Sequence, residues 1–394
     1  MNYHFSEALS GMDGTATRDI FKLLSRPEII SFAGGLPASD ALPTRLMGEI
    51  AAEIFVDETE ALRCLQYSVT EGYPGFRETV IDLVRDLGIT GITPDNVLVI
   101  SGGGQGLDLM LKAFVNKGDV VLMEDPTFLS FIQAAKSYNA VAVGVAADSD
   151  GVSLGDLEAK LKRYAPKLMY LIPTFSNPTG KTYPIEKRKA VIDLAHRYGV
   201  IILEDDPYSR LRFAGEPVPP MITLDKHGIV VYVSSFSKTI APGLRTGFAV
   251  GPAEIIRKLT IGKQNVDLHT SSLSQLAIKK YIEKGYFLPN IAKSIPLYRQ
   301  RKTAMTDAIN RYMPASFKHT DPDGGLFIWG EFDAPVNTTD MFQAAIAENV
   351  AYIVGSVFFA DGGGANTLRL NYTNESPERI EEGVQRLGRV FKGV

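Results

Sequence analysis

The sequence predicts an α/β fold, with a large domain built on a mostly parallel sheet and a smaller α+β domain. Between about residues 95 and 250, short apolar runs alternate with helical patterns. After about residue 290 the pattern changes to strands mixed with amphipathic helices. At 394 residues, the chain is also longer than one hydrophobic core usually serves, so about two domains are expected.

Five apolar runs in the first part have the length and composition of strands that are buried on both faces of a sheet. They are segments 97–100, 120–125, 168–173, 200–205 and 229–236. Two helical patterns stand between such runs: segment 107–115, and IEKRKAVIDLAHRYG, whose apolar face comprises Val191, Leu194, Ala195 and Tyr198. Strands that alternate with crossover helices indicate a parallel sheet.

The last hundred or so residues predict the smaller domain, since GGLFIWGEF, VAYIVG and TLRLNYT have strand patterns. The final helix is expected to begin after a capping Ser376, with Pro377 at its first position and Glu378 in its first turn. We expect three parts: an N-terminal arm or lid over 1–40 that packs with the small domain, a large domain over 41–289, and a small C-terminal domain over 290–394.

Composition and charge exclude several classes of function. The formal net charge is −4 and no long block of one sign occurs, so neither nucleic acid nor an anionic membrane is an expected partner. A single cysteine and five scattered histidines give no support for a disulfide framework or a metal site. The N-terminus lacks a signal-peptide pattern, and no apolar run approaches the ~20 residues of a membrane helix. A cytoplasmic protein is therefore expected.

Polar residues follow the predicted strands at their carboxyl ends, where open α/β sheets bind ligands. The first such segment is glycine-rich, Ser-Gly-Gly-Gly-Gln-Gly at 101–106, and a predicted helix follows it. Glycines at this place allow backbone N–H groups to approach a phosphate. The same segment is also compatible with a turn that serves only tight packing. A dinucleotide-binding loop is a further alternative, because an acidic pair follows about 20 residues later, although the glycines do not have the GxGxxG spacing.

Lys238 follows the strand at 229–236, within the sequence SSFSK. A lysine at a strand end is usually a solvated surface residue. In a partly apolar setting near Arg245, however, its amine can lose the proton and become a nucleophile toward aldehydes. Ser235 and Arg245 would in turn suit a phosphate dianion.

Four more polar residues allow both a structural and a functional interpretation. Asp205 ends an apolar strand, where it suits a helix cap, a buried salt bridge, or the cationic ring nitrogen of a cofactor. Asn177 fits an ordinary Asn-Pro turn and Tyr208 a core tyrosine, but both could also donate hydrogen bonds to a phenolate oxygen. Arg369 fits a surface ion pair, or bidentate binding of a carboxylate.

Together these residues resemble the fold-type I pyridoxal 5′-phosphate (PLP) aminotransferases, and the resemblance runs over nearly the whole chain. The segments that carry it are SFAGGLP (31–37), LQYSVTEGYPGFRE (65–78), NPTG (177–180), EDDPY (204–208), SSFSKTIAPGLRTGF (234–248) and TLRLNY (367–372). They are most similar to the branch of 2-aminoadipate aminotransferase and kynurenine aminotransferase II. The resemblance implies a seven-stranded-type sheet in the large domain, and a homodimer with shared active sites.

The resemblance also implies a role for each candidate residue. Lys238 would hold PLP as an imine and, once released, would move a proton between the substrate and the cofactor. Asp205 would pair with the pyridine nitrogen, Asn177 and Tyr208 would contact the phenolate oxygen, and Phe128 would stack on the ring. The remaining implied cofactor contacts are Gly103, Gly104, Gln105, Ser235, Ser237, Arg245 and Tyr67. The implied substrate contacts are Arg369, Asn177, Gly35, Arg18 and Tyr67.

Two features of the sequence, at positions 103–104 and 128, depart from the family pattern. Family loops commonly place a hydroxyl and an amide side chain at the phosphate, and both are missing at Gly103-Gly104. Phe128 stands where tyrosine is commoner, so a polar contact is lost.

Three functional hypotheses follow. The first is ping-pong transamination between an L-amino acid (2-aminoadipate, aromatic or branched-chain) and a 2-oxo acid, expected to be 2-oxoglutarate. The second is other PLP chemistry on the same scaffold, such as elimination or racemisation, because the shared residues serve all of these. A non-catalytic regulator is disfavoured, because no helix-turn-helix module is expected before the aminotransferase pattern. Arg18 leaves the substrate open, since it fits either a ligand for a distal carboxylate or a surface residue.

Overall fold

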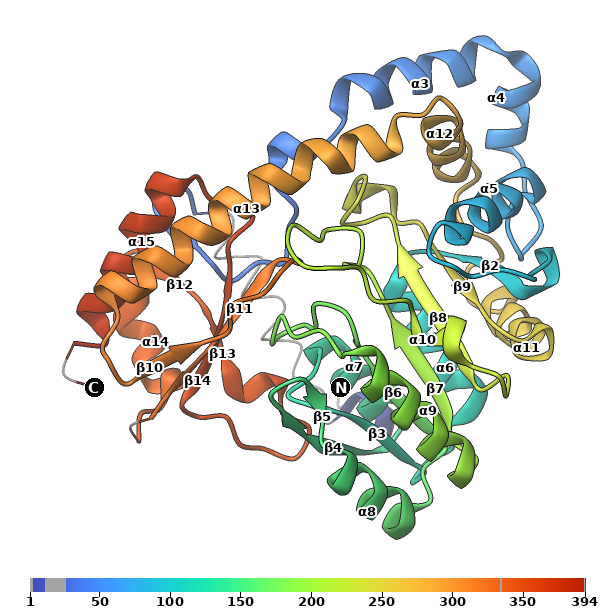
Figure 1. Cartoon of the computed structure of the whole chain (residues 1–394). Helices are drawn as coiled ribbons and strands as arrows, with labels where there is room; N and C mark the ends of the chain where they lie inside the picture. Colours follow the sequence, from blue (N-terminus) through green and yellow to red (C-terminus); the bar gives the residue numbers. More distant parts are fainter. Residues whose placement is uncertain (1–2, 11–25, 334, 393) are drawn as a thin grey trace.

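The computed structural model of the chain describes residues 3–10, 26–333, 335–392 and 394. In this part of the chain, the strands form an eight-stranded sheet, a four-stranded sheet and a short two-stranded one (Figure 1). Helices pack on both larger sheets. The predicted α/β architecture with a second, smaller α+β part is therefore confirmed.

The larger sheet is mostly parallel. Five neighbouring strands, β8, β7, β6, β3 and β4, run in one direction. β9 lies antiparallel between β8 and β2, and the two-residue β5 forms an antiparallel edge on β4. In spatial order the strands are β2 (Val97–Ile100), β9 (Gly247–Val250), β8 (Val230–Ser235), β7 (Ile201–Asp205), β6 (Leu168–Leu171), β3 (Val120–Asp125), β4 (Val141–Asp148) and β5 (Gly151–Val152). Without the short β5, the sheet has seven strands.

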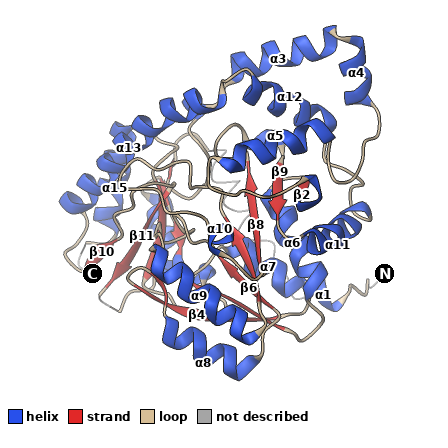
Figure 2. Ribbon diagram, turned by 45° about the vertical axis from the view of Figure 1, so that its right-hand side comes forward, coloured by secondary structure: helices blue, strands red, loops and turns tan. Residues whose placement is uncertain are grey.

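Helices cover both faces of this sheet, and Figure 2 shows α8 and α9 together on one side. In β6, Leu168 and Tyr170 join a buried cluster with α6 and α7, whereas Met169 and Leu171 join one with α8 and α9. Burial on both faces explains why these strands are apolar throughout. The helices of this part are α3 (Thr44–Val56), α4 (Glu58–Leu65), α5 (Pro74–Arg85), α6 (Gly103–Phe114), α7 (Leu129–Ser137), α8 (Leu154–Tyr164), α9 (Ile185–Tyr198), α10 (Met221–Leu224), α11 (Ala253–Gln264) and α12 (Ser272–Glu283).

The smaller sheet is antiparallel and contains, in spatial order, β10 (Phe317–His319), β11 (Phe327–Phe332), β14 (Thr367–Asn371) and β13 (Ile353–Val354). It packs with α13 (Phe287–Tyr312), α14 (Thr338–Ala347) and α15 (Pro377–Val390). The long α13 runs from the helices beside the large sheet to α15 (Figure 1). As predicted, the side chain of Ser376 caps α15, since it accepts a hydrogen bond from the backbone N–H of Arg379.

The N-terminal segment joins the smaller part through β1 (Ile30–Ser31), which pairs in parallel with β12 (Val350–Ala351). A short α1 (Glu7–Ser10) precedes it in the chain. The expected domain boundary at 289/290 falls inside α13, and the one at 40/41 falls inside the 3-10 turn Ser39–Ala41. The three-part division of the chain stays a proposal.

Within the described ranges, no helix combines the length and apolar composition that a membrane span needs. The same residues contain no cluster of three or more histidine, cysteine or acidic side chains arranged to hold a metal ion.

Candidate active site

A cavity of about 350 Å³ lies at the carboxyl ends of the parallel strands, between the large sheet and the small one. Its wall includes the last residues of β7 and β8, residues that follow β2 and β6, and residues of β11 and β14 in the small sheet. Most predicted site residues line this cavity: Gly35, Gly103, Gly104, Phe128, Asn177, Asp205, Tyr208, Ser235, Ser237, Lys238, Arg245 and Arg369. The topology of a parallel sheet explains the gathering, because its strand ends meet at one edge.

Lys238 extends into the cavity from the turn after β8, and its Nζ donates a hydrogen bond of 2.5 Å to the carbonyl oxygen of Gly35. Burial, reinforced by the positive charges of Arg369 and Arg245, lowers the pKa of this amine to about 8, although Asp205 opposes the shift. About half of the amine is therefore in its neutral, nucleophilic form at pH 8, and the neutral fraction increases above that pH.

Asp205 ends β7 with its carboxylate almost fully buried. Burial raises the pKa of this group to about 7, while a hydrogen bond from the hydroxyl of Tyr170 to Oδ2, 2.8 Å long, lowers it. Oδ1 accepts no hydrogen bond from the described residues, so it can receive a proton donor that enters the cavity. A cationic ring nitrogen would supply both that donor and the missing counter-charge.

The opposite end of the cavity is formed by the first turn of α6. The backbone N–H groups of Gly103 and Gly104 have no partners within the helix at this position, and they favour an anion. Gly102, with φ of +89°, packs against Arg245: a Cβ at this position would lie 2.4 Å from Nη2 of the arginine. Ser235 stands beside Gly103. The helix end, a guanidinium and a hydroxyl thus surround one point, which fits a phosphate group.

Arg369 is held rigidly without an anionic partner. Its Nη1 donates to Oδ1 of Asn177 and its Nη2 to the carbonyl oxygen of Ala33, both at 2.8 Å. The guanidinium also lies over the ring of Phe327, at 4.1 Å from the centroid. Burial lowers its pKa to about 10, so the group remains charged at neutral pH. A buried cation with only neutral partners among the described residues favours an incoming carboxylate.

Aromatic side chains shape the middle of the cavity. Tyr208 contacts the edge of the Phe327 ring at a centroid distance of 5.9 Å, and burial raises the pKa of its hydroxyl, which therefore stays protonated. Phe128, at the start of α7, faces the same space. Such rings suit a flat aromatic ligand that stacks between them.

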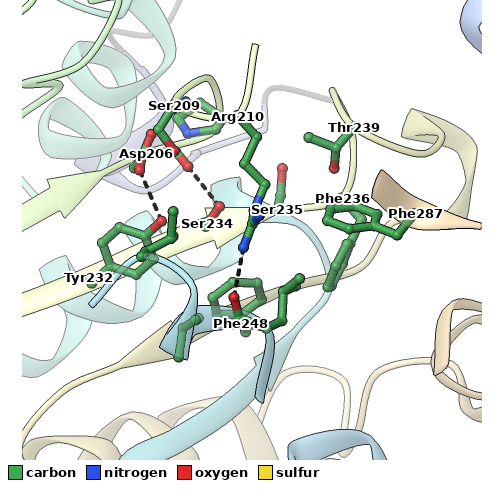
Figure 3. A pocket seen from close by; sticks show the side chains of 14 residues that line it. Asp206, Ser209, Arg210, Tyr232, Ser234, Ser235, Phe236, Thr239, Phe248 and Phe287 are labelled. Carbon is green, nitrogen blue, oxygen red and sulfur yellow. Dashed lines mark hydrogen bonds between the residues drawn. The ribbon is translucent and has the colours of Figure 1, made fainter. Parts of the chain in front are cut away.

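The neighbouring ends of β7 and β8 are also tied together behind the cavity (Figure 3). There the hydroxyl of Tyr232 donates to Oδ2 of Asp206 at 2.9 Å, and the hydroxyl of Ser234 donates to the carbonyl oxygen of Asp206 at 2.7 Å. A second, small cavity of about 20 Å³ adjoins these residues. The bonds fix the strand ends that present Asp205 and Ser235 to the larger cavity.

Two predicted site residues of the described part of the chain, Gln105 and Tyr67, do not line the cavity. The side-chain amide of Gln105 is bound by Lys263 and Asp267, and its contact with the cofactor stays a prediction. Tyr67 is 80% exposed and lies edge-on to the ring of His269 at 6.1 Å, outside the cavity of its own chain. Arg18 lies outside the described residues.

The chain is similar to known aminotransferases over nearly its whole length. A family model described as aminotransferase class I and II matches residues 43–387. The chain is 39% identical to an aromatic-amino-acid aminotransferase of Thermococcus litoralis, over 99% of this chain and 94% of that protein. It is 38% identical to a 2-aminoadipate transaminase of Thermus thermophilus, over 99% and 97%. The crystal structure of a kynurenine aminotransferase of Pyrococcus horikoshii, which contains pyridoxamine phosphate, matches with a TM-score of 0.94 and 37% identity, over 98% and 96%.

The family match covers most of the chain, and both relatives align over nearly their full length. The cavity supplies a group suited to each part of the cofactor that such enzymes use. The chain belongs to the class I and II aminotransferases and is a PLP-dependent aminotransferase.

Proposed function

We propose that PLP binds in the 350 Å³ cavity, with its phosphate at the start of α6 and its ring nitrogen at Asp205. When bound, PLP supplies an aldehyde that condenses with amines and a conjugated ring that accepts electrons from the substrate Cα. One observation supports the proposal above all others. A lysine with a pKa of about 8, a buried carboxylate and an arginine without an anionic partner line the same cavity.

Each of these residues has a distinct task in the proposed reaction. Lys238 anchors the cofactor and, once displaced by substrate, takes the proton from Cα and returns it to the cofactor. Asp205 keeps a proton on the ring nitrogen. Arg369 binds the substrate α-carboxylate, and Asn177 holds the guanidinium group of Arg369 in place. The bound carboxylate orients the Cα–H bond of the substrate toward Lys238.

We propose a broad donor range that includes 2-aminoadipate, aromatic and branched-chain amino acids, with 2-oxoglutarate as the acceptor in a ping-pong cycle. The names of the relatives support acidic and aromatic donors. The cavity wall supports apolar side chains, since it contains Leu36, Leu129 and Phe327. A role for Arg18 toward acidic side chains belongs to this proposal as well.

We also propose that two copies associate, with Tyr67 of each entering the cavity of the other. Large apolar side chains are exposed along α3, α4 and the neighbouring loops: Phe55, Val56, Leu62, Leu65, Tyr67, Val69, Val266 and Leu268. Monomeric proteins rarely leave such a patch in water. A cytoplasmic location is part of the proposal, on the sequence grounds given above.

The visible spectrum of the purified protein tests the proposed reaction. Single amino acids should bleach the band of the bound cofactor, and 2-oxoglutarate should restore it. Donors can be ranked by the rate of bleaching. Bleaching without recovery by any 2-oxo acid would contradict transamination, and release of ammonia or of the opposite enantiomer would point to the other PLP chemistries.

A further inference from the structure

Lys263, on α11, is a buried charge that the proposed reaction does not use. Its side chain is completely buried, and its Nζ donates to both oxygens of Asp267 at 2.8 Å. The same ammonium group donates to Oε1 of Gln105 at 2.7 Å. The partner carboxylate is partly exposed, with 27% of the Asp267 side chain accessible. An ion pair whose ammonium group is buried adds little net stability by itself, because desolvation offsets most of the attraction. Its position is therefore the more informative feature.

The ion pair is connected to both ends of the glycine turn. Gln105 accepts a hydrogen bond from the backbone N–H of Ser101 at 2.8 Å, and its amide donates to Oδ2 of Asp267 at 2.8 Å. The hydroxyl of Ser101 donates to the same carboxylate oxygen at 2.7 Å. Ser101 and Gln105 are thus bound to the pair from below, and the three glycines at 102–104 span the gap between them.

Three consecutive glycines have no side chains to fix their backbone, and they lose more conformational entropy on ordering than other residues do. Gly102 adopts φ of +89°, whereas Gly103 and Gly104 begin α6. Since hydroxyl and amide side chains are absent at 103 and 104, a phosphate there would depend on correctly oriented backbone N–H groups in addition to Ser235 and Arg245. Such groups bind well only if their orientation is set before the ligand arrives.

We propose that Lys263 and Asp267 are positioning residues for the phosphate-binding turn. Through Ser101 and Gln105, they hold the backbone of 102–104 in the orientation that receives the cofactor phosphate. The inference rests on the proposed function, in that it assumes that the phosphate binds at the start of α6. It assigns a role to a buried cluster that touches neither the cofactor nor the substrate.

The test compares two ligands that differ only in the phosphate. Dissociation constants of PLP and of pyridoxal are measured on the cofactor-free full-length protein by equilibrium dialysis, for the wild type and for Lys263→Met. The variant should bind PLP about tenfold or more weakly, as expected for loss of charge-assisted hydrogen bonds. Its affinity for pyridoxal should change by less than about twofold. The phosphorus-31 resonance of bound PLP should also shift, because its N–H partners are no longer fixed.

Lys187→Met is a matched control, since Lys187 is also a buried lysine with acidic partners, Asp148 and Asp150, but its ammonium group binds neither Ser101 nor Gln105. It should leave both dissociation constants unchanged. Equal weakening of PLP and pyridoxal in Lys263→Met would overturn the positioning role. By contrast, a wild-type protein that binds both ligands equally would refute the phosphate site itself, and hence the proposed function.

A second variant covers the case in which Lys263→Met fails to fold, as judged by loss of its melting transition. Asp267→Asn keeps the shape of the side chain and one oxygen acceptor but removes the charge that holds Lys263. It should show the same selective loss of PLP affinity, to a smaller extent. A folded Asp267→Asn protein with wild-type affinity for PLP would contradict the inference.

Discussion

The two ends of the cavity recognise their ligands by different means. At one end, Asp205 and Arg369 present charged side chains that neighbouring polar groups hold in place. At the other end, Gly103 and Gly104 present backbone N–H groups, with Arg245 nearby. Ligand recognition at the first end therefore depends on the type of side chain, whereas recognition at the second end depends on a backbone geometry that distant residues set. Substitutions should therefore affect the two ends independently.

The largest effect is expected from Lys238→Ala, which removes the anchor and the proton carrier but leaves the phosphate end intact. Turnover with 2-oxoglutarate should fall by at least ~10²–10⁴-fold, the usual contribution of a general acid or base. Noncovalent PLP should nevertheless remain bound, as measured by dialysis. Lys258→Ala, on the exposed side of α11, is the control. If Lys238→Ala lost PLP completely, the two ends would not be independent.

The uptake of PLP by the cofactor-free protein should depend strongly on pH. Because burial and two arginines lower the pKa of Lys238 to about 8, the neutral amine increases with pH and levels off above that value. At pH 6 the neutral fraction is about a hundredth, so the rate of covalent uptake should fall by a similar factor. Asp205→Asn should move the midpoint to lower pH, since the carboxylate raises the pKa of this lysine. A midpoint near 10 would show that the amine is solvated instead.

Arg369→Lys should separate substrate binding from cofactor binding. Lysine keeps the charge but lacks the planar fork, so KM for amino acids should rise about 10- to 100-fold from the lost charge-assisted bonds. The dissociation constant of PLP should stay within about twofold of the wild type. Steady-state kinetics and dialysis on the same preparation provide both values. An unchanged KM would mean that the α-carboxylate binds elsewhere.

The contrast between the two ends also explains what the sequence could predict. Asp205 and Lys238 can be recognised in the sequence because each charged residue follows an apolar strand, and burying a charge there costs free energy unless the charge is paired or used. Tyr170, which donates to Asp205, occurs within a buried strand and has the pattern of an ordinary core residue. Lys263 and Asp267 have the spacing of a common surface pair on a helix, and only the fold shows that the lysine is buried.

The strands also differ in how well the sequence predicts them. The five apolar runs of the sequence correspond to strands β2, β3, β6, β7 and β8, because burial on both faces requires a continuous apolar run. The sequence of β4 is less distinctive, since it is rich in alanine and glycine and largely exposed toward its end. In β9, a glycine and an alanine make up two of the four residues. Neither strand has a pattern strong enough to stand out from a loop.

The smallest expected effect is a gain of affinity at the phosphate end, from Gly103→Ser with Gly104→Gln. A Cβ at Gly104 would meet nothing within 4 Å, and one at Gly103 would only approach Ser235 at 3.9 Å. The new hydroxyl and amide should bind the phosphate, so PLP affinity should rise a few-fold, by about 1 kcal/mol, while pyridoxal affinity stays constant. Isothermal titration with each ligand measures both.

Gly102→Ala is a control with the opposite expected effect on PLP affinity. The positive φ of Gly102 and its contact with Arg245 forbid a side chain at this position. It should weaken PLP selectively. The double substitution at 103 and 104 should also restore PLP affinity to Lys263→Met, because side-chain donors do not need a backbone that is fixed from below. If the double substitution does not restore PLP affinity, Lys263 and Asp267 must affect more than the glycine turn. Side-chain donors then cannot replace the backbone N–H groups at the phosphate.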